Sequence, residues 1–163
     1  MNANADTTKQ LQIYLQDHRA GSTFGVELAK RAANSNEGTP TGKFLARLVA
    51  EIEADVETLE QIMDRLDVDP AAIKNAGAWV GEKLGRLKLN SELSGPTPLG
   101  QLIELEGLYL GITGKRSMWE NLRTAEVPAL ESFGLDGLIA SAQSQLDELE
   151  PHRLQAARDA LGG

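Results

Sequence analysis

The chain has 163 residues, enough for one domain with a buried core, and it carries a formal net charge of −8. This acidic balance lacks the basic excess of a nucleic-acid-binding surface, and the absence of cysteine excludes disulfides, thiolate metal sites and thiol nucleophiles. Aromatic residues make up only 4% of the chain, so the core must be aliphatic, which favours helices packed on helices.

The N-terminal stretch MNANADTTKQ is polar and contains no apolar h-region, and no long apolar run follows it. We therefore expect no standard signal peptide, no membrane span and a cytoplasmic location. The predicted organisation is a flexible N-terminus at residues 1–6 followed by a single domain over residues 7–162.

Helix start and stop signals predict an all-α chain of four long helices and one short helix. Proline after a capping residue marks three of the starts, at Thr39-Pro40, Asp69-Pro70 and Thr97-Pro98. Asp6 or Thr7 is the expected cap of the first helix. The expected helices cover residues 7–34, 40–66, 70–89, 98–124 and 135–161.

A seven-residue apolar rhythm runs through the first, second and last long helices, and residues 98–124 are apolar over a wider arc. This pattern predicts a four-helix bundle with the short helix, residues 70–89, in the crossover between two helical hairpins. Three polar residues interrupt the apolar positions: His18, Asp55 and Arg153.

Glycine recurs at four-residue spacing within the expected helices. The instances are Gly77, Gly81 and Gly85 on the short helix, Gly21 with Gly25, and Gly107 with Gly111. Each interior glycine costs about 1 kcal/mol relative to alanine, so we interpret the spacing as close approach between helix backbones. The alternative is a self-association face on the short helix, with Trp79 at its edge.

Four phrases carry a resemblance to a known family: LQIYLQDHRAGSTFGVELAKR, FLARLVAEIEADVETLEQIMDRL, PLGQLIELEGLYLGITGKRSMWENL and LIASAQSQLDELEPHRLQAARDAL. Over residues 7–162 the chain resembles the ferritin-like superfamily, and within it the small bacterial ferritin-like bundles. The resemblance implies a di-metal carboxylate site in the bundle core, with one Glu from each of two helices and a Glu-x-x-His motif from each of the other two.

The metal-binding motifs implied by this resemblance are missing from the sequence. Three residues before His18 stands Leu15, and three before His152 stands Leu149, so there is no Glu-x-x-His motif.

Other residues stand where the implied ligands would be. Ile52 and Asp55 occupy the expected Glu and His positions of the second helix, and Glu150-x-x-Arg153 places a cation where the last helix would need a ligand.

We therefore expect no metal and no other cofactor. The alternative is iron or another divalent metal at an atypical site formed by His18, Asp55, Glu51 and Glu106.

The polar residues on the apolar positions are expected to form structural pairs. His18 and Asp55 lie at nearly equal distances from the turn near Glu37, and Arg153 and Glu106 at equal distances from Ala129 or Leu130, so each pair should lie at one height. A charge buried without a partner costs several kcal/mol, which requires such pairing inside a core. The alternative interpretation of His18 and Asp55 is half of a vestigial or mononuclear metal site.

Several further features have expected structural roles. The acid cluster Glu51, Glu53, Asp55, Glu57 and Glu60 reads mostly as a solvated face, and Lys83, Arg86 and Lys88 as salt-bridge partners for such a face. Tyr109 and Trp119 should anchor the core with a hydrogen-bonding tip, and Pro151 should kink the last helix near Asp147.

The sequence contains no Ser-His-Asp set, no phosphate loop and no paired carboxylates in a credible cleft, so no catalytic residue is predicted. The predicted function is that of a non-enzymatic ferritin-like bundle with a structural, interaction or stress-associated role, which forms a homodimer through its glycine-rich or apolar faces. One alternative is an oxygen-handling or redox metalloprotein with an atypical site. The other is an acidic adaptor that binds a basic protein partner.

Overall fold

A computed structural model of the chain describes residues 3–69 and 97–162, with side chains described from residue 8 onward. All regular elements in these residues are helical: α1 (Ala3–Ser35), α2 (Pro40–Arg65), α4 (Pro98–Thr124), the 3₁₀ helix η2 (Pro128–Phe133) and α5 (Leu135–Leu161). None of these helices is long and apolar enough to cross a membrane. The expected short helix, with its glycines, Trp79 and basic residues, lies outside the described residues.

Local capping chemistry explains where α2 and α4 begin. Thr39 and Thr97 are the N-cap residues, each followed by proline, and their hydroxyls accept hydrogen bonds from the amides of Gly42 and Gly100 at 3.0 Å. The predicted starts of both helices are confirmed. The expected start of α1 at Asp6 or Thr7 is wrong, because α1 begins at Ala3.

The last helix spans the predicted residues, and Pro151 lies inside it without ending it.

Neighbouring helices are antiparallel. Lys30 pairs with Glu53 and Arg19 with Glu60, so residue numbers fall along α1 as they rise along α2. Side-chain hydrogen bonds show the same antiparallel order for three other pairs of helices. They are Arg31–Glu104 and Tyr14–Asn121 between α1 and α4, Arg116–Gln143 and Arg123–Asp136 between α4 and α5, and Thr41–His152 and Arg47–Glu148 between α2 and α5.

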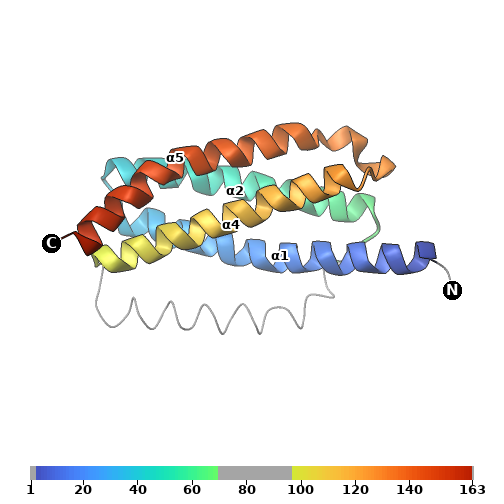
Figure 1. Cartoon of the computed structure of the whole chain (residues 1–163), viewed down its shortest axis with the longest axis horizontal. Coiled ribbons are helices and arrows are strands. Elements are labelled where there is room, and N and C mark those ends of the chain that lie inside the picture. Colours follow the sequence, from blue (N-terminus) through green and yellow to red (C-terminus); the bar gives the residue numbers. More distant parts are fainter. Residues whose placement is uncertain (1–2, 70–96, 163) are drawn as a thin grey trace.

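Since α1 lies beside α2 and α4, and α5 beside the same two helices, α2 and α4 are diagonal to each other across the interior. Figure 1 shows that these two helices run in the same direction, so α2 ends and α4 begins at opposite ends of the molecule.

The buried side chains form two apolar clusters along the length of the helices. The first contains residues near the α1–α2 turn, such as Leu28, Leu45 and Leu105, and the second contains Leu15, Ile62 and Trp119 near the other end. Along α2 the first cluster ends at Ile52 and the second begins at Leu59. Between the two clusters lies a layer of the interior that belongs to neither of them and can hold polar residues.

Only one of the four described glycines in question packs closely against another helix, and there the contact is with a side chain and not with a backbone. A Cβ on Gly107 would lie 2.9 Å from Cδ2 of Leu28, whereas a Cβ on Gly21, Gly25 or Gly111 would have no neighbouring atom within 4 Å. The interpretation as close helix approach is therefore wrong for these three glycines.

Candidate functional site

The layer between the two apolar clusters contains a partly buried lysine, Lys115 of α4. Its ammonium group contacts Oδ2 of Asp55 on α2, and it donates to Oε1 of Gln145 on α5 at 2.6 Å. The amide of Gln145 completes the triangle by donating to Asp55 Oδ2 at 3.4 Å. We call Asp55, Lys115 and Gln145 the interior polar network.

The positions of these three residues follow from the helix geometry. Ile112, Lys115 and Trp119 are spaced three and four residues apart, so all three project from the inner side of α4. Because α2 is diagonal to α4, only a long side chain reaches Asp55 across the interior, and lysine has that length. The interior polar network thereby links three helices at one level.

Because these side chains are largely removed from water, they would destabilise the fold if they were not paired with one another. The side chains of Lys115 and Asp55 are 14% and 10% exposed, and Gln145 is 2% exposed. Breaking a buried ion pair by removing one partner leaves the other charge uncompensated, at a cost of about 3–5 kcal/mol. The network therefore selects one arrangement of the three helices.

The expected pair of His18 and Asp55 is wrong. Asp55 bonds with Lys115 and Gln145, while the His18 ring packs edge-on against Tyr14, with the ring centroids 4.6 Å apart. Burial lowers the pKa of His18, and the nearby carboxylate of Asp17 opposes this shift only in part. His18 therefore favours its neutral form inside the fold.

The pairing of Arg153 with Glu106 is present, but it is not the buried pair that we expected. Nη1 of Arg153 lies 3.8 Å from Oε1 of Glu106, whose side chain is half exposed, and the guanidinium binds Glu150 in a bidentate manner at 2.7 Å. These hydrogen bonds lower the pKa of Glu150 and raise that of Arg153. The arrangement belongs to the surface of α4 and α5, where the Arg153 guanidinium also lies over the Tyr109 ring.

A second interior ion pair, between Arg31 of α1 and Glu104 of α4, was missed by sequence reasoning. Nε of Arg31 donates to Oε1 of Glu104 at 2.8 Å, and the Glu104 side chain is 10% exposed. Burial raises the pKa of Glu104, although Arg31 acts in the opposite direction. The available signal was the position of Glu104, four residues before Leu108 on the inner side of the helix.

The four residues named for an atypical metal site do not converge. Asp55 belongs to the interior polar network, Glu51 pairs with Arg47 at 3.3 Å, Glu106 lies beside Arg153, and His18 packs on Tyr14. Within residues 8–69 and 97–162, no group of three or more His, Asp or Glu side chains is arranged to hold a metal ion.

The acid cluster on α2 is engaged in ion pairs between neighbouring helices. Glu53 binds Lys30 at 2.8 Å and Glu60 binds Arg19 at 2.6 Å, while Glu57 is exposed. The expectation of a mostly solvated face is correct for Glu57 and incomplete for the paired carboxylates, which join α1 to α2.

Trp119 is fully buried as expected, but its expected hydrogen bond is missing. In the described part of the chain, its buried indole Nε1 has no hydrogen-bond partner. Trp119 therefore contributes to the core through apolar packing against the second cluster.

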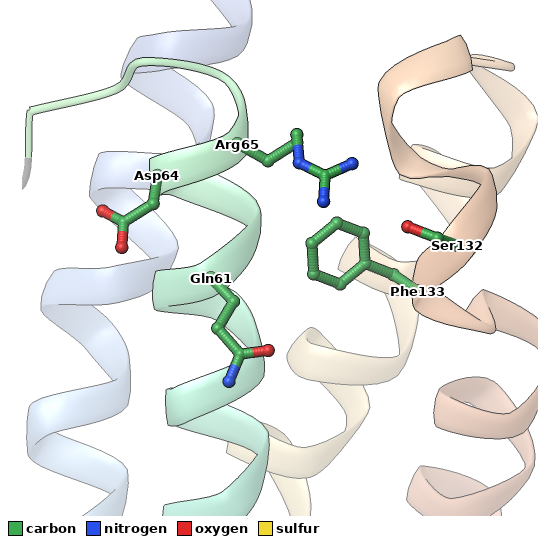
Figure 2. Close-up of a pocket in the computed structure, with 5 residues that line it drawn as sticks. All are labelled: Gln61, Asp64, Arg65, Ser132 and Phe133. Atoms are coloured by element: carbon green, nitrogen blue, oxygen red, sulfur yellow. The ribbon is translucent and has the colours of Figure 1, made fainter.

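A surface hollow of about 570 Å³ lies between the end of α2 and η2, and Figure 2 shows the residues that line it. Arg65 extends over the ring of Phe133, at 5.6 Å from its centroid, and donates to the carbonyl oxygen of Ala129 at 3.4 Å. Ser132 lies on the same side, whereas Asp64 points away from the other lining residues. These contacts join the two helical hairpins at this end, and the Asp64 carboxylate is directed away from the Arg65 guanidinium.

In comparisons with protein-family models, curated proteins and solved structures, no family, protein or structure matches this chain.

Proposed function

We propose that the chain is a ferritin-like four-helix bundle whose core is neutralised by the Lys115 ammonium group instead of metal ions, and that its role is structural or interactive and not catalytic. The observation that carries this proposal is the interior polar network, which lies between the two apolar clusters.

The connectivity of the helices supports the ferritin-like part of the proposal. Two antiparallel hairpins, α1–α2 and α4–α5, are joined so that α2 and α4 run in the same direction (Figure 1). A bundle with one long crossover has this order of helix directions, and ferritin-like folds are of that type.

The chemistry of the interior polar network supports the metal-free part. A di-metal site of this family requires several carboxylates and imidazoles that converge on the ions. Here the interior polar network offers a single carboxylate, Asp55, and one amide oxygen, from Gln145, and an ammonium group binds both. A divalent ion at this place would have to displace Lys115 and would be repelled by its charge.

The contacts of the α2 carboxylates favour this proposal over an acidic adaptor. Glu51, Glu53 and Glu60 are each bound to an arginine or lysine of the same chain. These contacts leave less free negative charge for a basic partner.

Metal analysis of protein purified without chelator tests the proposal, together with absorption spectra recorded after ferrous iron is added in air. The expected result is substoichiometric metal and no new absorption band, both in the natural chain and in the matched Arg116→Gln variant. In Lys115→Gln, which removes the ammonium but keeps a polar group, weak binding of a divalent ion by Asp55 is the expected gain. About two iron ions per natural chain, the content of a di-iron bundle, would overturn the proposal in favour of an oxygen-handling or redox protein.

A further inference from the structure

The surface hollow between the end of α2 and η2 contains an arginine, Arg65, that is not paired with a carboxylate. Most arginines in the described part of the chain form ion pairs with Asp or Glu: Arg19, Arg31, Arg47, Arg116, Arg123 and Arg153. Among the described residues, Arg65 and Arg158 form no such pair. In a chain with 24 Asp and Glu residues against 16 Lys and Arg residues, an arginine without a carboxylate is an exception.

Two contacts hold the Arg65 guanidinium at the hollow. Its Nη1 donates to the carbonyl oxygen of Ala129 at 3.4 Å, and the group lies over the ring of Phe133, at 5.6 Å from the ring centroid. A guanidinium carries several N–H donors in a planar fork, so donors remain after the single hydrogen bond to Ala129. Because the group is already held in place, it loses less conformational entropy when it binds a ligand.

The other polar residues of the hollow suit an anion. Figure 2 shows the Ser132 hydroxyl on the same side as the Arg65 guanidinium, next to the Phe133 ring, and the Asp64 carboxylate directed away. Within residues 8–69 and 97–162, the side chains of Ser132 and Gln61 form no hydrogen bond with the protein. The volume of about 570 Å³ falls in the range of small-molecule sites, about 300–1,000 Å³.

We propose that this hollow binds the carboxylate or phosphate group of a small molecule, with Arg65 as the cation and the Ser132 hydroxyl as a second donor. The planar fork of a guanidinium matches both oxyanions in a bidentate manner. The Phe133 ring offers an apolar surface to the rest of the ligand. This inference goes beyond the proposed function, because the hollow lies at the end of the bundle and does not depend on how Lys115 neutralises the interior.

A cation in the last turn of α2 is favoured by the helix dipole whether or not a ligand binds. The test therefore measures binding and not stability. The ¹⁵N-labelled natural chain is titrated with benzoate, with phenyl phosphate and with benzamide, an uncharged analogue of benzoate, while NMR follows the Arg65 Nε–H and the Ser132 backbone amide. We expect saturable shifts of both signals with at least one anion and none with benzamide, and the anion that binds more tightly identifies the preferred group.

Three variants assign the binding to the hollow. Arg65→Gln should weaken it about tenfold or more, because a hydrogen-bonded charge is lost, and Ser132→Ala should weaken it severalfold. Arg158→Gln is the matched control: it removes the same charge from α5, where Arg158 contacts Gln155, and should leave the affinity unchanged.

Other results would overturn the proposal. Without saturable shifts for either anion, the hollow is not an oxyanion site. Full affinity in Arg65→Gln or in Ser132→Ala means that the anion binds elsewhere. Equal weakening by Arg65→Gln and Arg158→Gln means that the chain attracts anions only through its overall charge.

Discussion

Replacement of Lys115 by methionine tests the role of the interior polar network. Methionine retains much of the apolar length of lysine but has no ammonium group, so Asp55 would remain buried without its cation. Both side chains are less than 15% exposed, so the pair belongs with buried ion pairs, and not with surface pairs worth about 0–1 kcal/mol. We expect Lys115→Met to lower the free energy of unfolding by about 3–5 kcal/mol, and Asp55→Leu by a similar amount.

The double variant separates lost pairing from lost packing. With both charges removed, no uncompensated ion remains, and the principal residual cost is the amide of Gln145, about 1–3 kcal/mol for a buried polar group without a partner. Destabilisation of the double variant should therefore fall short of the sum of the single variants by about 2 kcal/mol or more.

Urea unfolding followed by far-UV circular dichroism measures all three free energies, and the single variants should also lower Tm by about 6–20 °C. The reasoning would be refuted if each single variant cost less than about 1 kcal/mol and the two effects were additive. Combining Asp55→Leu with His18→Leu provides the control, because these side chains are not paired and their effects should add.

Three further predictions concern the turn, the helices and pH. A Cβ at position 42 would lie 2.0 Å from the backbone oxygen of Asn36, so Gly42→Ala should destabilise the fold by about 1–3 kcal/mol. A Cβ at position 111 would have open space around it, so Gly111→Ala should stabilise the fold by about 1 kcal/mol. The midpoints of urea unfolding compare the two variants, and equal effects would contradict the prediction. The pKa of His18 is lowered from 6.5, so the unfolded chain binds the proton more readily and stability should fall as pH drops below 6.5. His18→Gln should reduce this fall in the free energy of unfolding. An unchanged slope of that free energy against pH would contradict the prediction. The pKa of Glu104 is raised from 4.5, so the folded chain binds the proton more readily and stability should decrease as pH rises above 4.5 towards the raised value. Glu104→Gln should remove that decrease when the free energy of unfolding is measured over the same pH range. If the decrease persists in the variant, another group is responsible for it.

Helix limits could be read from the sequence because their causes are local. The hydroxyls of Thr39 and Thr97 accept hydrogen bonds from amides three residues later. The prolines that follow them lack a backbone N–H, and at the first helical position that group would have no acceptor within the helix. The apolar rhythm indicated the inner side of each helix for the same reason, since spacing within one helix decides which side chains share a face.

The partner of Asp55 could not be read in the same way. Counting residues from the turn near Glu37 gave the height of His18 relative to Asp55, but height alone does not decide which side chain reaches the carboxylate. The ammonium group of Lys115 reaches the carboxylate from the diagonal helix, because the lysine side chain is longer than that of histidine. A signal was present, because Lys115 stands between Ile112 and Trp119 at inward spacing, where a cation requires an anion.

The sequence by itself therefore determined the all-helical class, the starts of α2 and α4 and the extent of α5, because capping, proline and apolar spacing act within a few residues. Only the tertiary structure decided which charges meet: Lys115 with Asp55 and Gln145, and Arg31 with Glu104. These pairings depend on which helices lie side by side and which lie diagonally, and that arrangement is set by the packing of all four helices together.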